Sequence, residues 1–150
     1  MSLKETIQND MKAAMRAKDQ AALRTLRAIK AVILNAEVSE GRNGEPLSED
    51  EEMALLIKQA KQRRDSISQF EANGREDLAT TEKEELEVIE RYLPKQLSEA
   101  EIEAKVKAII EKTGASSMKD MGKVMGMASK EMAGTADGKV ISGIVKRLLQ

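Results

Sequence analysis

The chain has 150 residues, of which 41% are apolar and 34% are charged, and its formal net charge is −1. It contains no Cys and no His, which excludes disulfide bonds, thiolate chemistry and the commonest general base and metal ligand. Aromatic residues are nearly absent, and because strands favour aromatic and β-branched residues, this composition argues against a sheet. We therefore predict an all-α protein and expect no cofactor and no metal.

Four helices are predicted in the N-terminal part, each with a recognisable start. Ser2, Ser48 and Thr81 each precede a Glu by three residues, the pattern of a capping box, and Asp19 is a suitable N-cap. Apolar residues recur at helical spacing after each start. The predicted helices cover residues 3–18, 20–38, 48–73 and 81–93, with a polar, Gly-containing loop over 39–46.

Pro94 ends this part, because Pro lacks a backbone donor and disfavours helix at the residue before it. We place a domain boundary here, between an N-terminal helical domain over residues 1–94 and a C-terminal domain over 95–150. The C-terminal domain is expected to hold three helices. The first begins with the capping box at Ser98 and stops at Thr113-Gly114, and the last begins with Asp137 as N-cap.

No run of about 18 apolar residues is present, so the sequence indicates no transmembrane helix and no membrane partner. The N-terminus also lacks the apolar core of a secretory signal peptide. On these grounds we expect a cytoplasmic protein.

The segment 117–149 departs from an ordinary amphipathic pattern. It holds five of the nine Met residues, and Gly122 and Gly126 lie four residues apart, on one face of a helix. We call these two residues the glycine strip. Gly costs a helix about 1 kcal/mol relative to Ala, so the strip indicates that something approaches the backbone closely. One interpretation is a neighbouring helix packed against it, and the other is an RNA backbone.

Residues 115–150 carry six basic and three acidic residues, in a chain that is slightly acidic overall. The candidate phosphate ligands around the glycine strip are Lys119, Lys123, Lys130, Lys139, Lys146 and Arg147. The turn 134–138 is interpreted as a tight interhelical turn capped by Asp137. In the other interpretation, the helix N-terminus beside Lys139 holds one phosphate in addition.

Secondary candidates lie in the N-terminal part. Arg24 and Arg27, three residues apart, share a helical face with Lys30, and Lys61 and Arg64 do the same in the third helix. If the second and third helices pack together, these cations could form one basic patch. The alternative is a solvated surface in which acidic neighbours pair with them.

Carboxylate runs are abundant, as at Glu49–Glu52 and Glu82–Glu87, but they lie at predicted helix starts, where the helix dipole favours acidic residues. No pairing of a nucleophile with a base is recognisable. The sequence therefore argues against an enzyme that acts by itself.

Several separated motifs together resemble the YqeY family over nearly the whole chain. They are L-R-T-L-R-A-I-K (23–30), K-x-R-R-D-S-I-x-Q-F (61–70), G-R-E-D-L-A (74–79), Y-L-P-K-Q-L-S (92–98), D-M-G-K-V-M-G (120–126) and G-T-A-D-G-K (134–139). The last fifty-odd residues are also similar to the tail domain of GatB, the tRNA-binding subunit of glutamyl/aspartyl-tRNA amidotransferase. The positions that correspond to the tail's motifs are Gly122, Val124, Met125, Gly126, Gly134, Ala136 and Asp137. Two departures are Gly126 and Thr135, which stand where the tail usually has basic residues.

The resemblance implies a non-catalytic helical protein that binds tRNA or another structured RNA. The catalytic parts of the amidotransferase have no counterpart here, so a carbon–nitrogen ligase activity with glutamine as amido donor is implied only as an accessory role. A second alternative is an adaptor whose Met and Gly face binds a helix of a protein partner. Salt dependence separates RNA binding from this alternative, because phosphate contacts weaken as salt rises.

Overall fold

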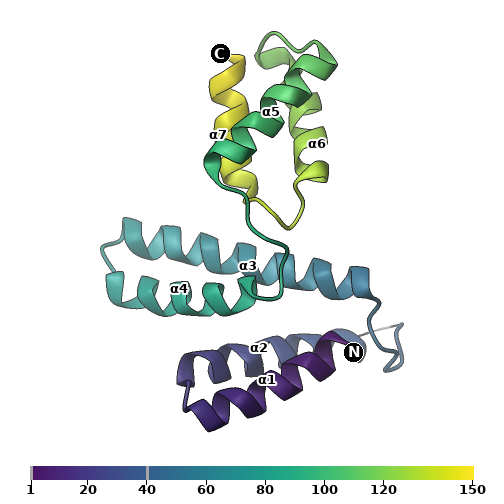
Figure 1. Ribbon diagram of the computed structural model, residues 1–150, viewed down its shortest axis with the longest axis vertical. Coiled ribbons are helices and arrows are strands. Elements are labelled where there is room, and N and C mark those ends of the chain that lie inside the picture. The colour runs from purple at the N-terminus through teal and green to yellow at the C-terminus, as the bar shows by residue number, and fades with distance from the viewer. Residues whose placement is uncertain (1, 40) are drawn as a thin grey trace. The chain divides into compact units, whose positions relative to one another are not determined.

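The computed structural model describes residues 2–39 and 41–150. In this part of the chain there are seven α-helices, one short 3₁₀ turn and no strand, which confirms the all-α prediction (Figure 1). The chain forms two compact units, Met1–Leu93 and Pro94–Gln150. Whether the predicted domains on either side of Pro94 fold independently stays a prediction.

The N-terminal unit consists of two helical hairpins. Helix α1 packs on α2, α3 packs on α4, and α2 contacts both α3 and α4 (Figure 1). Ser2 and Ser48 form the predicted capping boxes, and the Asp19 carboxylate accepts the Ala22 N–H. The helices are α1 (Leu3–Ala17), α2 (Gln20–Glu37), α3 (Glu49–Ala72) and α4 (Glu76–Glu90).

Aliphatic side chains from all four helices form the core of the N-terminal unit. The largest fully buried ones are Ile7, Ile29, Ile33, Leu56 and Ile89. The buried Thr25 hydroxyl donates to the Ala21 carbonyl at 2.8 Å, so it brings no unsatisfied polar group into the core. At the edge of this core the Tyr92 hydroxyl donates to the Asp10 carboxylate. Burial, together with this hydrogen bond, raises the pKa of Tyr92.

The start of the fourth helix differs from the prediction. Helix α4 begins at Glu76, two residues after the left-handed Gly74 that follows α3, and Thr81 lies inside it. Ala79 is fully buried, and the acidic Glu76 and Asp77 lie in the first turn, where the helix dipole favours them. The Thr-x-x-Glu pattern at residue 81 was therefore misread, because the same spacing also occurs within a helix.

In the polar loop between α2 and α3, the backbone has positive φ at three residues, Gly41, Asn43 and Gly44. The Arg42 guanidinium closes the loop, because it lies 2.5 Å from the Glu51 carboxylate and donates to the Pro46 carbonyl at 2.9 Å. Glu40, which falls in the predicted loop, lies outside the described residues.

The C-terminal unit is a three-helix domain around its own core. Gly114 ends the first helix in a left-handed conformation, as predicted, and Ser117 and Asp120 form a capping box at the 3₁₀ turn that the sequence analysis did not identify. Met132 is fully buried, and three more Met side chains pack against the core. The elements are α5 (Glu99–Thr113), η1 (Met118–Asp120), α6 (Met121–Glu131) and α7 (Gly138–Leu149).

The segment that enters this unit is fastened to the turn between α6 and α7. The Leu97 N–H donates to the Thr135 carbonyl at 2.8 Å. The Gln96 side-chain amide donates to the carbonyls of Gly134 at 2.8 Å and Pro94 at 2.9 Å. The Thr135 hydroxyl donates in turn to the Met132 carbonyl, so it has a local structural role.

Replacing Met132 by Ala tests whether the Met residues belong to the core. We expect a loss of about 2–5 kcal/mol in the free energy of unfolding, because the substitution leaves a cavity at a fully buried position. The matched control is Met118→Ala at a side chain that is 40% exposed, where the change should stay within about 0.5 kcal/mol. Urea unfolding followed by circular dichroism measures both variants. An equal loss of stability in the two would contradict the assignment of Met132 to the core.

Candidate nucleic-acid interface

Helix α6 has two chemically different faces. Val124 and Ala128 point inward and are fully buried, whereas the glycine strip, Gly122 and Gly126, is exposed. No atom lies within 4 Å of the position that a Cβ would take at either glycine. The close packing of a neighbouring helix, one of the two interpretations of the strip, therefore does not occur within the described part of the chain.

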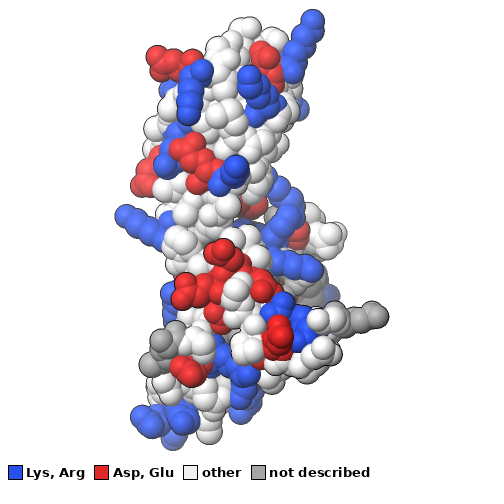
Figure 2. Space-filling model, turned by 90° about the vertical axis from the view of Figure 1, so that its right-hand side faces the viewer, with Lys and Arg blue, Asp and Glu red and all other residues white. Residues whose placement is uncertain are grey.

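Three lysines lie beside the glycine strip. Lys119 precedes α6 in η1, while Lys123 and Lys130 are seven residues apart, so they lie on the same side of the helix. All three are exposed, and none of their ammonium groups has an ion pair or a hydrogen bond in residues 2–39 and 41–150. Figure 2 shows Lys and Arg side chains projecting from the C-terminal unit, with acidic side chains gathered between some of them.

Helix α7 has a similar outer face. Its helical spacing places Lys139, Gly143, Lys146 and Arg147 opposite the buried Ile141 and Val145. Gly143 is exposed with no atom within 4 Å of a Cβ position, and Lys146 has no side-chain partner in the described residues. The Arg147 guanidinium lies 3.3 Å from the Glu103 carboxylate. Gly143 was not among the residues predicted from the sequence, although its position four residues after Lys139 places it on the same helical face.

The turn before α7 has the predicted cap. The Asp137 carboxylate accepts the Lys139 N–H at 3.2 Å, which confirms Asp137 as N-cap. This carboxylate places a negative charge at the helix N-terminus where a phosphate would otherwise be attracted. The geometry therefore favours the interpretation of 134–138 as a tight interhelical turn.

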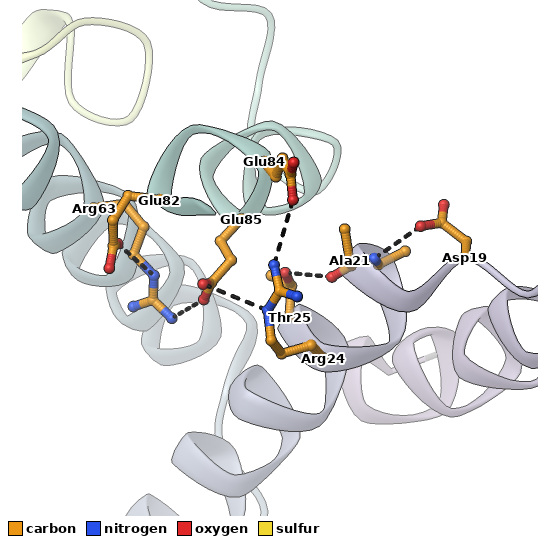
Figure 3. Close-up of polar contacts among 9 residues, drawn as sticks. Asp19, Ala21, Arg24, Thr25, Arg63, Glu82, Glu84 and Glu85 are labelled. Atoms are coloured by element: carbon orange, nitrogen blue, oxygen red, sulfur yellow. Dashed lines mark hydrogen bonds and ion pairs between the residues drawn. The ribbon is translucent and has the colours of Figure 1, made fainter. Parts of the chain in front are cut away.

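The secondary cations of the N-terminal unit meet carboxylates of α4 instead of merging into a basic patch. Arg24 lies 3.5 Å from Glu84 and 3.7 Å from Glu85 (Figure 3). Arg63 joins the same network, 3.3 Å from Glu85 and 3.9 Å from Glu82.

Of the other three candidate cations in this unit, two also pair with a carboxylate. Lys61 pairs with Asp65 at 2.9 Å, and Arg64 lies 3.3 Å from Glu90. Arg27 is exposed and has no side-chain partner in the described residues. The salt-bridged surface, the alternative to a basic patch, is therefore what the structure shows at Arg24, Lys61 and Arg64.

Within this network, the folded structure disfavours the charged form of Glu82. Burial raises its pKa, and repulsion from Glu85 adds to the effect. Attraction to Arg63, 3.9 Å away, opposes the shift but does not reverse it.

The N-terminal unit has a cleft of about 510 Å³ between α1, α2 and the start of α3. In this cleft, Lys4 pairs with the buried Glu37 at 2.9 Å, and Lys30 donates to the Gln8 side-chain oxygen at 2.5 Å. In the described residues, no group of three or more carboxylates is arranged to hold a metal ion.

The comparison with protein families decides what the chain is related to. A family model described as Yqey-like protein matches residues 4–149. The chain belongs to the YqeY-like family. The match covers both units and agrees with the motifs identified in the sequence.

Relatives of this family member carry the name "Altered inheritance of mitochondria protein 41, mitochondrial". The protein from Pyrenophora tritici-repentis is 34% identical over 148 residues, which are 95% of this chain and 78% of that protein. The protein from Lachancea thermotolerans is 39% identical over 106 residues, 69% of this chain and 56% of that protein. The protein from Saccharomyces cerevisiae is 34% identical over 109 residues, 70% of this chain and 57% of that protein. The chain thus matches little over half the length of the last two.

These names contradict the predicted cytoplasmic location, because they assign the relatives to mitochondria. The prediction was wrong because it rested on the lack of an apolar signal-peptide core. That criterion concerns secretion, whereas mitochondrial targeting segments are amphipathic and rich in Arg. No helix in the described residues combines the length and the apolar character needed to span a membrane.

Replacing Gly126 by Ala tests the exposure of the glycine strip. Because no atom lies near the added Cβ, the substitution should raise the free energy of unfolding by about 0.5–1 kcal/mol through better helix propensity. Gly114→Ala is the contrasting control. Gly114 adopts φ +69°, so Ala there should destabilise the fold by about 1–2 kcal/mol. Thermal unfolding measures both, and destabilisation by Gly126→Ala would show that the strip is packed.

Replacing Glu82 by Gln tests the cost of its burial. A carboxylate whose pKa is raised in the folded state stabilises the fold at low pH, and this contribution is lost as the pH rises through the folded-state pKa. The variant should therefore be more stable than the wild type at pH 7, and the difference should vanish below about pH 4. Urea unfolding at several pH values measures it, with the exposed Glu87→Gln as a control that should show no such trend. A less stable variant at pH 7 would mean that attraction to Arg63 dominates.

Proposed function

We propose that the C-terminal unit binds tRNA or another structured RNA through contacts to its phosphates. The observation that carries this proposal is the set of exposed lysines beside the glycine strip, Lys119, Lys123 and Lys130, which have no side-chain partner in the described residues. An ammonium group that has no carboxylate partner can bind a phosphate without first breaking an ion pair.

The distribution of charge supports this assignment. Residues 94–150 contain ten Lys and Arg against seven Asp and Glu, whereas residues 1–93 contain fifteen against nineteen. The excess positive charge therefore belongs to the C-terminal unit, and electrostatic attraction of a polyanion would favour it. Lys139, Lys146 and Arg147 on α7 add to the same unit. Arg24, Arg27, Lys61 and Arg64 are weaker candidates, because three of the four already pair with carboxylates.

The exposed glycines explain how a large polyanion could approach. Gly122 and Gly126 leave the backbone of α6 uncovered, so a phosphate chain can come closer to the helix than any side chain would permit. The lysines beside the strip then reach such a chain from one side. RNA approach is the second of the two interpretations of the strip, and it is compatible with the open space found there.

The adaptor alternative receives less support from the geometry. It requires the Met side chains and the glycine strip to form one face. However, Met132 is fully buried, and Met121, Met125 and Met127 pack against the core of the unit. Only Met118 of the five is counted among the exposed large apolar residues of the described chain. An accessory role in a glutamine-dependent amidotransferase is not favoured by any particular contact.

A charge-reversal variant tests RNA binding by the full chain. In Lys123→Glu/Lys130→Glu, two attractive contacts become repulsive, so binding to labelled bulk tRNA should weaken at least tenfold at low salt. The slope of log affinity against log salt should also fall by about two. Fluorescence anisotropy at several salt concentrations measures both quantities.

The matched control is Lys12→Glu/Lys18→Glu, which makes the same charge change at exposed lysines of the N-terminal unit. It should leave affinity nearly unchanged. Absence of saturable tRNA binding by the wild type at low salt would refute the proposal, as would equal weakening by the two double variants.

A further inference from the structure

We propose that the C-terminal unit recognises the backbone of double-stranded RNA and neither stacks on bases nor distinguishes their sequence. This inference rests on the RNA binding proposed above and specifies the class of ligand. Three features of the unit support it. The unit has no aromatic side chains, its cations are nearly all Lys with the one Arg paired to a carboxylate, and two neighbouring helices have open backbone.

The unit has no aromatic side chain on which a base could stack. Residues 94–150 contain no Phe, Tyr or Trp, since Phe70 and Tyr92 both belong to the N-terminal unit. Proteins that bind single-stranded nucleic acids gain much of their affinity from bases stacked on aromatic rings, about 1–3 kcal/mol for each base. A single strand would therefore be held here by charge alone and would lose entropy on being ordered.

The cations of the unit are suited to phosphates more than to bases. Nine of its ten basic residues are Lys, a compact point charge, and Arg147 is the only Arg. The guanidinium of Arg is the group that most often binds a base edge in a bidentate manner or stacks on a base plane. That of Arg147 is held 3.3 Å from the Glu103 carboxylate. Sequence discrimination through Arg is therefore not favoured, whereas phosphate contacts by Lys123, Lys130 and Lys146 are.

Two packed helices present a similar outer surface. Helix α6 packs against α7, and each has exposed glycines beside lysines, at Gly122 and Gly126 on one and at Gly143 on the other. Lys123 and Lys130 are about 10 Å apart along the helix axis, far enough to contact different phosphates of one duplex. The minor groove of double-stranded RNA is wide and shallow and displays 2′-hydroxyls, so the open backbone at the glycines can approach it while the lysines beside them reach the phosphates. The exposed Ser129 hydroxyl, three residues after Gly126, can hydrogen-bond to such a group.

The test compares two labelled RNAs with equal numbers of phosphates, titrated with the full chain at the same salt. One is a hairpin with a stem of about 16 base pairs, a length that shape-selective domains can span, and the other is an unstructured U-rich strand. We expect the hairpin to bind at least tenfold more tightly. A hairpin with a shuffled stem sequence should bind within about threefold of the first, because no base is distinguished.

Two variants locate the contact. Gly126→Leu/Gly143→Leu, which covers the open backbone on both helices without changing charge, should reduce the preference for the hairpin while the strand binds as before. Ala133→Leu, at another exposed position of the same unit, is the control and should have no effect. Circular dichroism verifies that all variants keep their helical content.

The outcomes separate this inference from the proposed function. If the single strand binds as tightly as the hairpin, or the shuffled stem binds more than tenfold differently, the inference is overturned and RNA binding stands. If neither RNA binds at low salt, both are overturned. If the Leu variants leave the preference unchanged, the open backbone is not the recognition surface and the inference also fails.

Discussion

The helices of this protein pack together almost without aromatic side chains, and much of the structure follows from that constraint. Aliphatic residues and Met bury less area per residue than aromatic ones, so each core needs apolar side chains from every helix around it. In the C-terminal unit, this requirement draws Met121, Met125, Met127 and Met132 to the inner side of α6 and the residues after it. The outer side of α6 does not take part in the core, and the residues there include glycine and lysine.

Electrostatics distinguishes the two units more sharply than their shared helical character does. In the N-terminal unit, carboxylates of α4 pair with arginines of α2 and α3, and the resulting network joins the two hairpins around Glu85. In the C-terminal unit, the cations of α6 lack such partners within the described residues. The same residue types therefore have different consequences: arginine between helices consolidates the fold, and lysine on an outer face leaves charge available to a ligand.

Local patterns predicted the helices well, because capping residues and glycine stops act within one turn. Ser2, Asp19, Ser48, Gly114 and Asp137 all lie where their chemistry predicted. Thr81 misled because a capping pattern is also compatible with a helix interior, and α4 has already begun at Glu76. Properties that depend on packing between helices could not be predicted. The spacing of Arg24 and Lys61 does not reveal that carboxylates lie opposite them, and the spacing of Gly122 and Gly126 does not tell whether a neighbour covers them.

The hydrogen bonds between residues 96–97 and the turn 134–135 have a mechanical consequence. Tension on the chain at Pro94 would reach the C-terminal unit first through the Leu97 amide and the Gln96 side chain, and these are anchored to the turn that precedes α7. The load would thus bypass α5 and act at the junction of the two helices that carry the lysines.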